Sequence, residues 1–366
     1  MDAPAGTSPG DVTQAELRLA ARNHGMPLEA LRYPVTPVGM HYLLIHYDIP
    51  PVDTATWRLQ LGGAVERPLS LSLGELRALP AVTRRVTMEC AGNGRALLAP
   101  RPLSQPWLTE AVGTGEWTGV PLRVVLEAAA VGRDAVEVLF TGLDRGVEGG
   151  VEQAYARSLP LAEALGADAL LAYELNGGPL PPQHGFPLRL VIAGWYGMAH
   201  VKWLTSITAL TEPFEGYQQA VGYRLYDADG TPGAPVTRML PRSLTLHPGV
   251  PDFMTRERVV DAGDHVLRGR AWSGWGAIAR VEVSVDGGAT WEDAKLDEPG
   301  DERAWRGWTY TWDATSPGVY VLSSRATDAA GHSQPLEPPW NLKGYANNAV
   351  ERVPVVVRAA SQPPPG

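Results

Sequence analysis

The spacing of apolar residues changes after Leu210, and this change constrains the fold more than any other feature of the 366-residue chain. Between Trp57 and Leu210, strand-like alternation and helical spacing follow one another. Beyond residue 256, short alternating segments recur between turn signals, with almost no helical spacing. Because a chain of this length usually divides into two cores, the sequence predicts a mixed α+β domain followed by an all-β domain.

Individual elements follow from the same spacing. Residues 57–61 and 136–140 alternate as strands, whereas residues 73–79 and 122–130 have helical spacing. Residues 211–256 are rich in Pro, Gly, Tyr and Asp with weak periodicity, as expected of a connector. The remaining predicted strands cover residues 188–192, 201–210, 266–272, 279–285, 308–312, 319–326 and 352–357. The strands beyond residue 256 favour a β-sandwich of immunoglobulin-like type.

Cys90 is the only cysteine of the chain, so it is not used for an internal disulfide. It lies where a strand-like run breaks into the small-residue turn Glu-Cys-Ala-Gly-Asn-Gly-Arg, residues 89–95. Gly92 and Gly94 remove side-chain bulk, so that a large group can approach the backbone. Arg95 brings a cation that favours a thiolate or binds an anion. Two interpretations follow from the residues: a thiolate ligand for a soft or high-valent metal, or a small buried hydrophobic side chain.

The segment 89–95 resembles the molybdenum-ligand loop of the sulfite oxidase family, in which the cysteine binds molybdenum and a pyranopterin dithiolene supplies the other sulfurs. The resemblance covers residues 40–357, and further segments occur in the family's order. They are residues 170–177 (Leu-Leu-Ala-Tyr-Glu-Leu-Asn-Gly), 183–189 (Gln-His-Gly-Phe-Pro-Leu-Arg), 201–204 (Val-Lys-Trp-Leu) and 340–344 (Trp-Asn-Leu-Lys-Gly).

The resemblance implies an α+β fold class: a sulfite-oxidase-type mixed molybdopterin-binding domain followed by an immunoglobulin-like β-sandwich of the dimerisation type. We therefore divide the chain into four segments. They are an N-terminal tail (1–40), partly helical; the molybdopterin-binding catalytic domain (41–235); the sandwich (236–358); and a C-terminal tail (359–366).

The same resemblance implies a set of site residues. Cys90 is the expected metal ligand and a catalytic residue. His184 and Arg189 are expected to bind the phosphate and pterin of the cofactor, a role that suits arginine because its planar fork binds phosphate with two hydrogen bonds. The other expected cofactor-binding residues are Tyr42, His46, Arg95, Asp144 and Lys202.

Tyr223 matches the family's active-site tyrosine by its spacing, and its phenol would donate to an oxo group or to the substrate. Tyr217 and Tyr226 are close enough in sequence to remain alternatives. Eukaryotic sulfite oxidases have arginines where this chain has Leu44 and Lys343. Lys343, expected to be catalytic, keeps a cation, whereas Leu44 contributes none, so the pocket should attract an oxyanion less strongly.

Two segments of the second domain have alternative interpretations. Arg303 and Arg306 replace the missing charge if the sandwich overhangs the pocket; otherwise they belong to a solvated strand face. Residues 284–291 match the aspartate box of sialidase propellers. Because propellers repeat this motif and here it occurs once, the segment predicts a hairpin turn with Trp291 packed beneath it.

The resemblance implies an oxidoreductase with a molybdenum–molybdopterin cofactor that transfers an oxygen atom in a two-electron reaction. The expected substrate is sulfite or a related small sulfur oxyanion or sulfur compound. One alternative is a molybdenum-dependent reductase of sulfoxides or similar acceptors, and another is a cofactor-free binding or scaffold protein. Since the chain has no haem-attachment motif and too few cysteines for an iron–sulfur cluster, the electrons go to a separate cytochrome, another carrier or oxygen.

Charge and hydropathy restrict the remaining partners. The formal net charge of −9 argues against non-specific nucleic-acid binding, which needs a positive surface. No apolar run is long enough to cross a bilayer. Residues 1–10 show no basic region followed by an apolar one, so we expect a cytoplasmic protein, or a periplasmic one if a leader has been removed. The resemblance also implies a homodimer.

Overall fold

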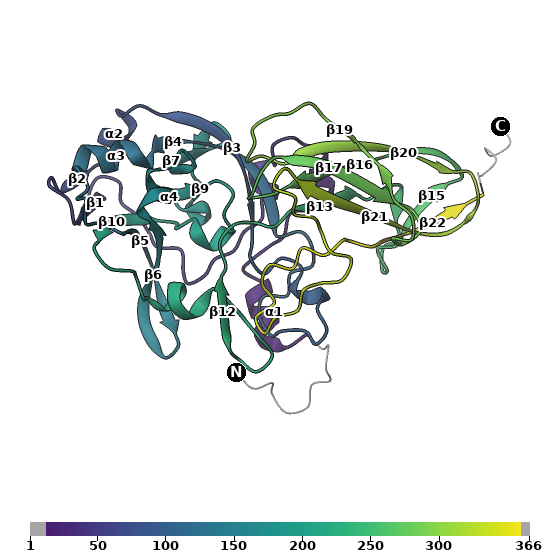
Figure 1. Cartoon of the computed structure of the whole chain (residues 1–366), viewed down its shortest axis with the longest axis horizontal. Helices are drawn as coiled ribbons and strands as arrows, with labels where there is room; N and C mark the ends of the chain where they lie inside the picture. Colours follow the sequence, from purple (N-terminus) through teal and green to yellow (C-terminus); the bar gives the residue numbers. More distant parts are fainter. Residues whose placement is uncertain (1–11, 360–366) are drawn as a thin grey trace.

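Two groups of β-sheets lie side by side in the computed structural model, which describes residues 12–359 (Figure 1). The N-terminal unit is on the left of Figure 1 and the C-terminal unit on the right. Each has its own buried apolar core. Among the described residues, no helix is both long and apolar enough to span a membrane.

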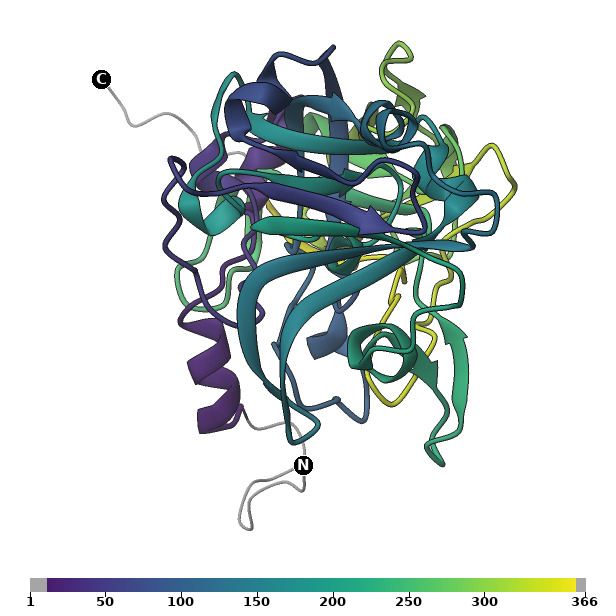
Figure 2. The same ribbon diagram turned by 90° about the vertical axis from the view of Figure 1, so that its left-hand side faces the viewer.

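The N-terminal unit contains two five-stranded sheets. One has the order β2-β1-β10-β5-β6, in which β1 and β10 are parallel and the other neighbours antiparallel. The strands are β1 (Leu59–Gly63), β2 (Leu69–Leu71), β5 (Glu137–Glu148), β6 (Val151–Pro160) and β10 (Leu204–Leu210). The β5 and β6 hairpin extends well beyond its sheet (Figure 2).

The second sheet of this unit has the order β3-β4-β7-β8, and β9 also pairs with β7. Its strands are β3 (Val82–Glu89), β4 (Val112–Pro121), β7 (Ala169–Leu175), β8 (Gly178–Pro179) and β9 (Arg189–Ile192). Strand β3 is half-exposed at its start and fully buried over its last four residues. The strand therefore delivers the residue after Glu89 into the interior of the molecule.

Helices are few and short, so the molecule is richer in sheet than the α+β prediction suggested. Helix α3 (Leu122–Ala129) buries Leu122, Val125, Leu126 and Ala129, the stripe expected of an amphipathic helix. Helices α2 (Leu73–Arg77) and α4 (Leu161–Leu165) have only five residues each. Pro80 follows α2 closely and Gly166 ends α4, which explains why neither helix continues.

The C-terminal unit has two sheets, of orders β13-β16-β20-β19 and β14-β15-β22-β21-β17-β18, which share an apolar core containing Trp308, Trp312 and Leu322. The five strands predicted here are all present as β16, β17, β20, β21 and β22. The bounds are β13 (Arg242–Leu246), β14 (Val250–Pro251), β15 (Arg258–Asp261), β16 (Gly263–Trp272), β17 (Ile278–Ser284), β18 (Glu292–Asp293), β19 (Lys295–Leu296), β20 (Arg306–Ala314), β21 (Gly318–Asp328) and β22 (Val353–Arg358).

The expected connector over residues 211–256 is only partly correct. It contains the π-helix η6 (Gln218–Gly222) and the hairpin of β11 (Arg224–Tyr226) and β12 (Pro232–Pro235). However, β13 and β14 already belong to the C-terminal sheets. Strand β13 escaped prediction because three of its four buried residues, Arg242, Ser243 and Thr245, are polar.

The described part of the expected N-terminal tail, residues 12–40, packs against the rest of the protein. Helix α1 (Gln14–Ala20) begins with a capping box formed by Thr13 and Glu16. Glu16 is buried and forms an ion pair with Arg101. Further along, Met26 and Leu31 enter a core cluster that includes Trp272 of the C-terminal unit. The segment thus joins the two units instead of projecting as a tail.

Residues 284–291 form the predicted turn. Asp286 Oδ1 accepts hydrogen bonds from the backbone N–H groups of Ala289 and Thr290, each at 2.9 Å. Gly287 and Gly288 have φ angles of 75° and 99°, which favour glycine. The indole Nε1 of Trp291 donates to the Gly288 carbonyl at 3.0 Å, so the ring packs against the turn as expected.

Candidate functional site

One pocket of the N-terminal unit brings together all but two of the predicted site residues. They approach it from strand ends and loops: Cys90 follows β3, Asp144 lies in β5, and Arg189 begins β9. Arg95 and Lys343 are the two exceptions. The predicted residues that line the pocket are Tyr42, His46, Cys90, Asp144, His184, Arg189, Lys202 and Tyr223.

Cys90 is a free, buried cysteine with an exposed fraction of 8%. Its backbone N–H donates to the Ala111 carbonyl at 2.9 Å, and its own carbonyl accepts from the Asn93 N–H at 3.0 Å. Burial raises the pKa of the thiol, and the nearby charge of Arg95 opposes that rise. The backbone next to this side chain is therefore fixed, and Cys90 is among the residues that line the pocket.

The glycines of the cysteine loop make room for groups of the protein itself. A Cβ atom on Gly92 would come within 2.6 Å of the Arg95 guanidinium. Gly94, with φ +84°, would meet the Asn347 side chain at 2.8 Å. The sequence prediction that these glycines admit an external group is thus corrected: the close neighbours are Arg95 and Asn347.

Arg189 is a buried cation that lines the pocket. Its Nη1 donates to the His184 carbonyl at 3.0 Å, and its guanidinium lies 4.8 Å from the centre of the Trp117 ring. Burial lowers the pKa of Arg189 to about 10, so the group stays charged at neutral pH. Burial, with the positive charges around it, lowers the pKa of His184 to about 2, so this imidazole is neutral.

Lys202 and Asp144 also line the pocket. Lys202 Nζ donates to the carbonyls of Leu44 at 2.7 Å and Gln183 at 3.1 Å. Burial and the charge of Arg189 lower the pKa of Lys202 to about 7. Burial raises the pKa of Asp144 to about 6. Both pKa values lie close to neutral pH, so binding of a charged group readily changes the protonation state of Lys202 and Asp144.

Tyr223 follows the π-helix η6 and is 8% exposed. Its ring centre lies 6.5 Å from that of His46, and the Arg157 guanidinium lies 5.6 Å from the Tyr223 ring. Burial raises the pKa of the Tyr223 phenol well above 10, so it remains a donor over the ordinary pH range. Of the three tyrosines considered, the pocket lining includes Tyr223 but neither Tyr217 nor Tyr226.

A polar network surrounds His46 at the edge of the pocket. The imidazole Nε2 lies 2.9 Å from Glu148 Oε2, and the same carboxylate oxygen accepts from the Tyr47 hydroxyl at 3.1 Å. Gln218 of η6 also hydrogen-bonds this carboxylate. Glu148 and Gln218 were not among the predicted residues, because neither lies in a recognised motif.

Arg95 and Lys343 support the pocket from behind instead of lining it. Arg95 Nε donates to the Lys343 carbonyl at 2.8 Å, and its guanidinium lies 5.1 Å from the centre of the Tyr345 ring. Lys343 Nζ donates to the carbonyls of Val221 at 2.7 Å and Gly222 at 3.0 Å. Lys343 thus contacts the backbone directly before Tyr223.

The suggestion that Arg303 or Arg306 replaces the missing pocket charge is wrong. Arg303 forms an ion pair with Asp168 at 2.9 Å. Arg306 donates to the carbonyls of Asp297 at 2.8 Å and Ile278 at 3.1 Å. Neither arginine lines the pocket; Arg303 is held by Asp168 of the N-terminal unit, and Arg306 by carbonyls of its own unit.

Sequence reasoning also missed three buried residues with titratable side chains that line the pocket: His41, Tyr155 and His200. Burial lowers the pKa of His41 to about 4 and that of His200 to about 3, so both are neutral. The positions of the two histidines in the sequence could have identified them, since His41 directly precedes Tyr42 and His200 lies two residues before Lys202.

The pocket residues fit a polar, anionic group. His41 Nε2, Asp144 Oδ1 and Arg189 Nε are buried and have no hydrogen-bond partner among residues 12–359. Leaving such atoms unpaired is costly, so a ligand with both donors and acceptors, such as a pterin with its phosphate, would satisfy them. The free volume is about 70 Å³, so side chains that line the pocket must move to admit a ligand of that size.

A second, larger cleft, of about 950 Å³, does not include Cys90 in its lining. It is formed by residues of the N-terminal segment, of the stretch 97–110 and of the C-terminal unit, including Met26, Glu110, His247 and Arg258. Because none of the predicted site residues lines it, the smaller pocket is the candidate active site.

Comparisons with known proteins agree with this choice. Residues 46–218 match the family described as the oxidoreductase molybdopterin binding domain. Residues 244–358 match the Mo-co oxidoreductase dimerisation domain. The first match contains the pocket residues from His46 to Lys202, and the second covers the strands of the C-terminal unit from β14 onwards.

Individual relatives span most of this chain. Human mitochondrial sulfite oxidase is 36% identical over 348 residues, which cover 88% of this chain and 62% of the human protein. Barley nitrate reductase [NAD(P)H] is 32% identical over 350 residues, covering 88% of this chain and 39% of the barley protein. This chain therefore corresponds to less than two thirds of either relative.

A solved structure has the same overall arrangement. The sulfane dehydrogenase SoxCD from Paracoccus pantotrophus superposes with a TM-score of 0.78 at 25% sequence identity. The superposition covers 98% of this chain and 96% of that chain. Both units and their relative placement are thus shared with a known protein.

Proposed function

The chain belongs to the sulfite oxidase family of molybdenum-dependent oxidoreductases, and from this premise we propose that it transfers an oxygen atom in a two-electron reaction. The proposed substrate is sulfite or a related small sulfur oxyanion. The observation that carries the proposal is the convergence of Cys90, His184, Arg189 and Tyr223 on one pocket with unpaired buried polar atoms.

The residues divide into a metal ligand and a cradle for the cofactor. Cys90 would hold the metal through its thiolate, for which deprotonation of the buried thiol is required. Arg189 and Lys202 would bind the negative charge of the phosphate, and the neutral His184 would hydrogen-bond the pterin. When bound, the molybdenum cofactor supplies the redox chemistry and the transferable oxygen.

Tyr223 would donate a hydrogen bond to the substrate or to the bound cofactor. Its phenol remains protonated because burial raises its pKa, so it donates a hydrogen bond without acting as a charged group. The Arg157 guanidinium beside its ring adds a positive field that favours an anionic substrate. Lys343 holds the backbone before Tyr223 in place.

The identity of the substrate depends on the charge of the pocket mouth. Leu44 lines the pocket where eukaryotic sulfite oxidases carry an arginine, and Glu148 adds a carboxylate next to His46. Both features weaken the attraction for a dianion. They favour, as a second candidate, a reductase that removes oxygen from a sulfoxide or similar acceptor, and the similarity to barley nitrate reductase supports a reductive direction.

Two steady-state assays separate the candidates. Sulfite with an artificial electron acceptor tests the oxidase, and a sulfoxide with a reduced dye tests the reductase. We expect turnover in the sulfite assay. Turnover only with the sulfoxide would replace the proposal by the reductase, and a protein that binds no metal in a cofactor-competent host would instead be a scaffold.

The organisation of the whole protein is also a proposal. We propose a catalytic domain over residues 41–235 and an immunoglobulin-like sandwich over 236–358 that pairs two copies of the chain, in line with the dimerisation-domain match. Electrons would pass to a separate cytochrome, another carrier or oxygen, in the cytoplasm or the periplasm. A mass measurement in solution tests the dimer directly.

A further inference from the structure

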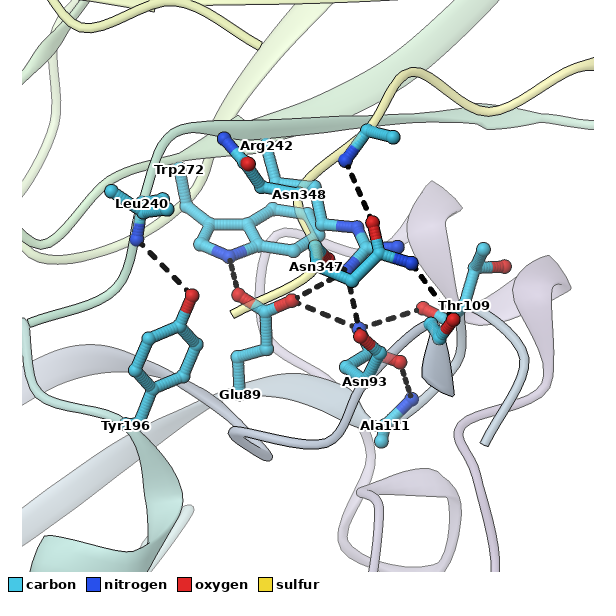
Figure 3. Close-up of polar contacts among 12 residues, drawn as sticks. Glu89, Asn93, Thr109, Ala111, Tyr196, Leu240, Arg242, Trp272, Asn347 and Asn348 are labelled. Carbon is cyan, nitrogen blue, oxygen red and sulfur yellow. Dashed lines mark hydrogen bonds and ion pairs between the residues drawn. The ribbon is translucent and has the colours of Figure 1, made fainter. Parts of the chain in front are cut away.

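A buried carboxylate stands between the cysteine loop and the C-terminal unit. Glu89, the residue before Cys90, has a side chain that is only 3% exposed. Its Oε1 accepts from Arg242 Nη1 at 2.9 Å, and its Oε2 accepts from Trp272 Nε1 at 2.9 Å. Arg242 in β13 and Trp272 in β16 are paired across the sheet of the C-terminal unit. Figure 3 shows the Glu89 carboxylate between these two side chains and the loop.

The same carboxylate also orders the turn that follows Cys90. Asn93 Nδ2 donates to Glu89 Oε1 at 2.9 Å and to the Thr109 carbonyl at 3.1 Å (Figure 3). Asn93 Oδ1 accepts from the Ala111 N–H at 3.0 Å, and the Ala111 carbonyl in turn accepts from the Cys90 N–H at 2.9 Å. A chain of hydrogen bonds therefore runs from the C-terminal unit to the backbone of the cysteine.

Residues 346–347 of the C-terminal segment hold the other side of the loop. The Ala346 N–H donates to the Ala91 carbonyl at 2.8 Å. Asn347 Nδ2 donates to the Gly94 carbonyl at 2.8 Å, while the Asn347 carbonyl accepts from Arg242 Nη1 at 2.8 Å. Arg242 thus connects Glu89 with the segment that closes over the loop.

Stability alone does not account for this network. The side chains of Arg242 and Glu89 are 2% and 3% exposed. The free energy needed to remove two charges from water offsets much of their mutual attraction. In some proteins a buried polar or ionic group fixes a unique geometry instead of adding stability. Both members of the pair contact Asn93, which lies in the short segment that contains the only cysteine.

We propose that Glu89, Arg242 and Trp272 are positioning residues, through which the C-terminal unit sets the orientation of the Cys90 sulfur toward the pocket. The role of Cys90 as metal ligand rests on the proposed function, whereas the fixed orientation of its thiol does not. The C-terminal unit is thereby part of the active-site machinery as well as a candidate pairing surface.

The thiol itself reports on this positioning, because Cys90 is the sole cysteine and its modification can be followed without interference. In cofactor-free protein, the rate of reaction with an aromatic disulfide reagent measures how often the loop opens. Trp272→Phe removes one donor while keeping an aromatic ring, and Glu89→Gln removes the charge and places an amide against donors. Arg303→Met is the matched control, since it breaks an ion pair with Asp168 that also joins the two units but does not contact the loop.

We expect Trp272→Phe and Glu89→Gln to accelerate modification about tenfold or more, since a hydrogen bond to a charged group is worth at least that factor. Arg303→Met should stay within about twofold of the wild type, because its contacts do not reach the loop. Equal rates in all proteins, or an equal acceleration by Arg303→Met, would overturn the proposal. If Glu89→Gln fails to fold, Trp272→Phe alone decides.

A second readout links the network to the metal. In protein purified from a cofactor-competent host, molybdenum retained after dialysis should fall in Trp272→Phe and Glu89→Gln but not in Arg303→Met. Molybdenum retained equally in all variants would contradict the positioning role. Absence of molybdenum from the wild type would contradict the proposed function and leave the thiol experiment to decide on positioning.

Discussion

The ammonium group of Lys343 lies 3.0 Å from the carbonyl oxygen of Gly222, the residue directly before Tyr223. The same group donates to the Val221 carbonyl at 2.7 Å, so one cation from the C-terminal segment caps the end of π-helix η6. Lys343, which was predicted to attract a charged substrate, instead holds the backbone directly before Tyr223. It therefore affects the pocket indirectly, through the position of Tyr223.

Replacing Lys343 by Met should loosen this cap. We expect kcat/KM to fall by about tenfold, the effect of losing a hydrogen bond from a charged group, with unchanged molybdenum content. Lys295→Met, on the exposed strand β19, is the control and should not change kcat/KM. Equal activity of the two variants would show that Lys343 does not position the tyrosine.

Removing the phenol of Tyr223 should lower turnover directly. For Tyr223→Phe we expect kcat to fall by about 10- to 100-fold, the range for a donor that acts in the transition state. Tyr217→Phe, which removes a hydroxyl of the same segment outside the pocket lining, should remain within about twofold of the wild type. The reverse ranking in steady-state assays would assign the role to Tyr217.

Introducing Leu44→Arg should restore a cation at the pocket. If the substrate is sulfite, its KM should fall by about tenfold at low salt, and the gain should shrink at high ionic strength. Leu44→Met, which keeps a neutral side chain, provides the comparison. A KM that responds to neither substitution would indicate that a dianion is not the substrate bound beside this residue.

The buried Lys202 predicts a pH dependence for the cofactor-free protein. Its pKa in the folded state is lowered to about 7 from the usual 10.5, so the unfolded chain binds its proton more tightly. Between these pH values the unfolded state carries more protons, and the free energy of unfolding therefore rises with pH. Below about pH 7 the buried Lys202 is protonated in the folded state as well, and it destabilises that state by its full amount.

Lys202→Met removes the titrating ammonium group and with it the contribution of this group to the pH dependence of the free energy of unfolding. Urea unfolding at pH 7 and pH 8.5 should show the free energy of unfolding of the wild type rising by about 1 kcal/mol more than that of Lys202→Met. Lys295→Met should behave like the wild type, since its side chain is exposed. Parallel pH profiles for wild type and Lys202→Met would show that Lys202 keeps an ordinary pKa.

Residues in local motifs were predictable because a motif carries its own geometry. The segment 183–189 places His184 and Arg189 five residues apart, and the structure holds them together by the hydrogen bond between Arg189 Nη1 and the His184 carbonyl. Likewise, the alternation in residues 352–357 reflects one buried face of β22, whose buried residues are Val353, Val355 and Val357.

Long-range contacts account for what the sequence did not reveal. Glu89 hydrogen-bonds Arg242 and Trp272, which lie 153 and 183 residues further along the chain. No local sequence pattern marks such a long-range contact. Glu16 looked like part of a polar tail because its partner Arg101 lies 85 residues away. Charged side chains that become buried through a distant partner resemble surface residues in the sequence.

The molybdenum content of the purified protein tests the central claim most directly. After expression in a host that makes the cofactor, elemental analysis should find one molybdenum per chain in the wild type and almost none in Cys90→Ser, which removes the thiolate ligand at the pocket. Wild-type protein without molybdenum, or a Cys90→Ser variant that keeps the metal in full, would contradict the account.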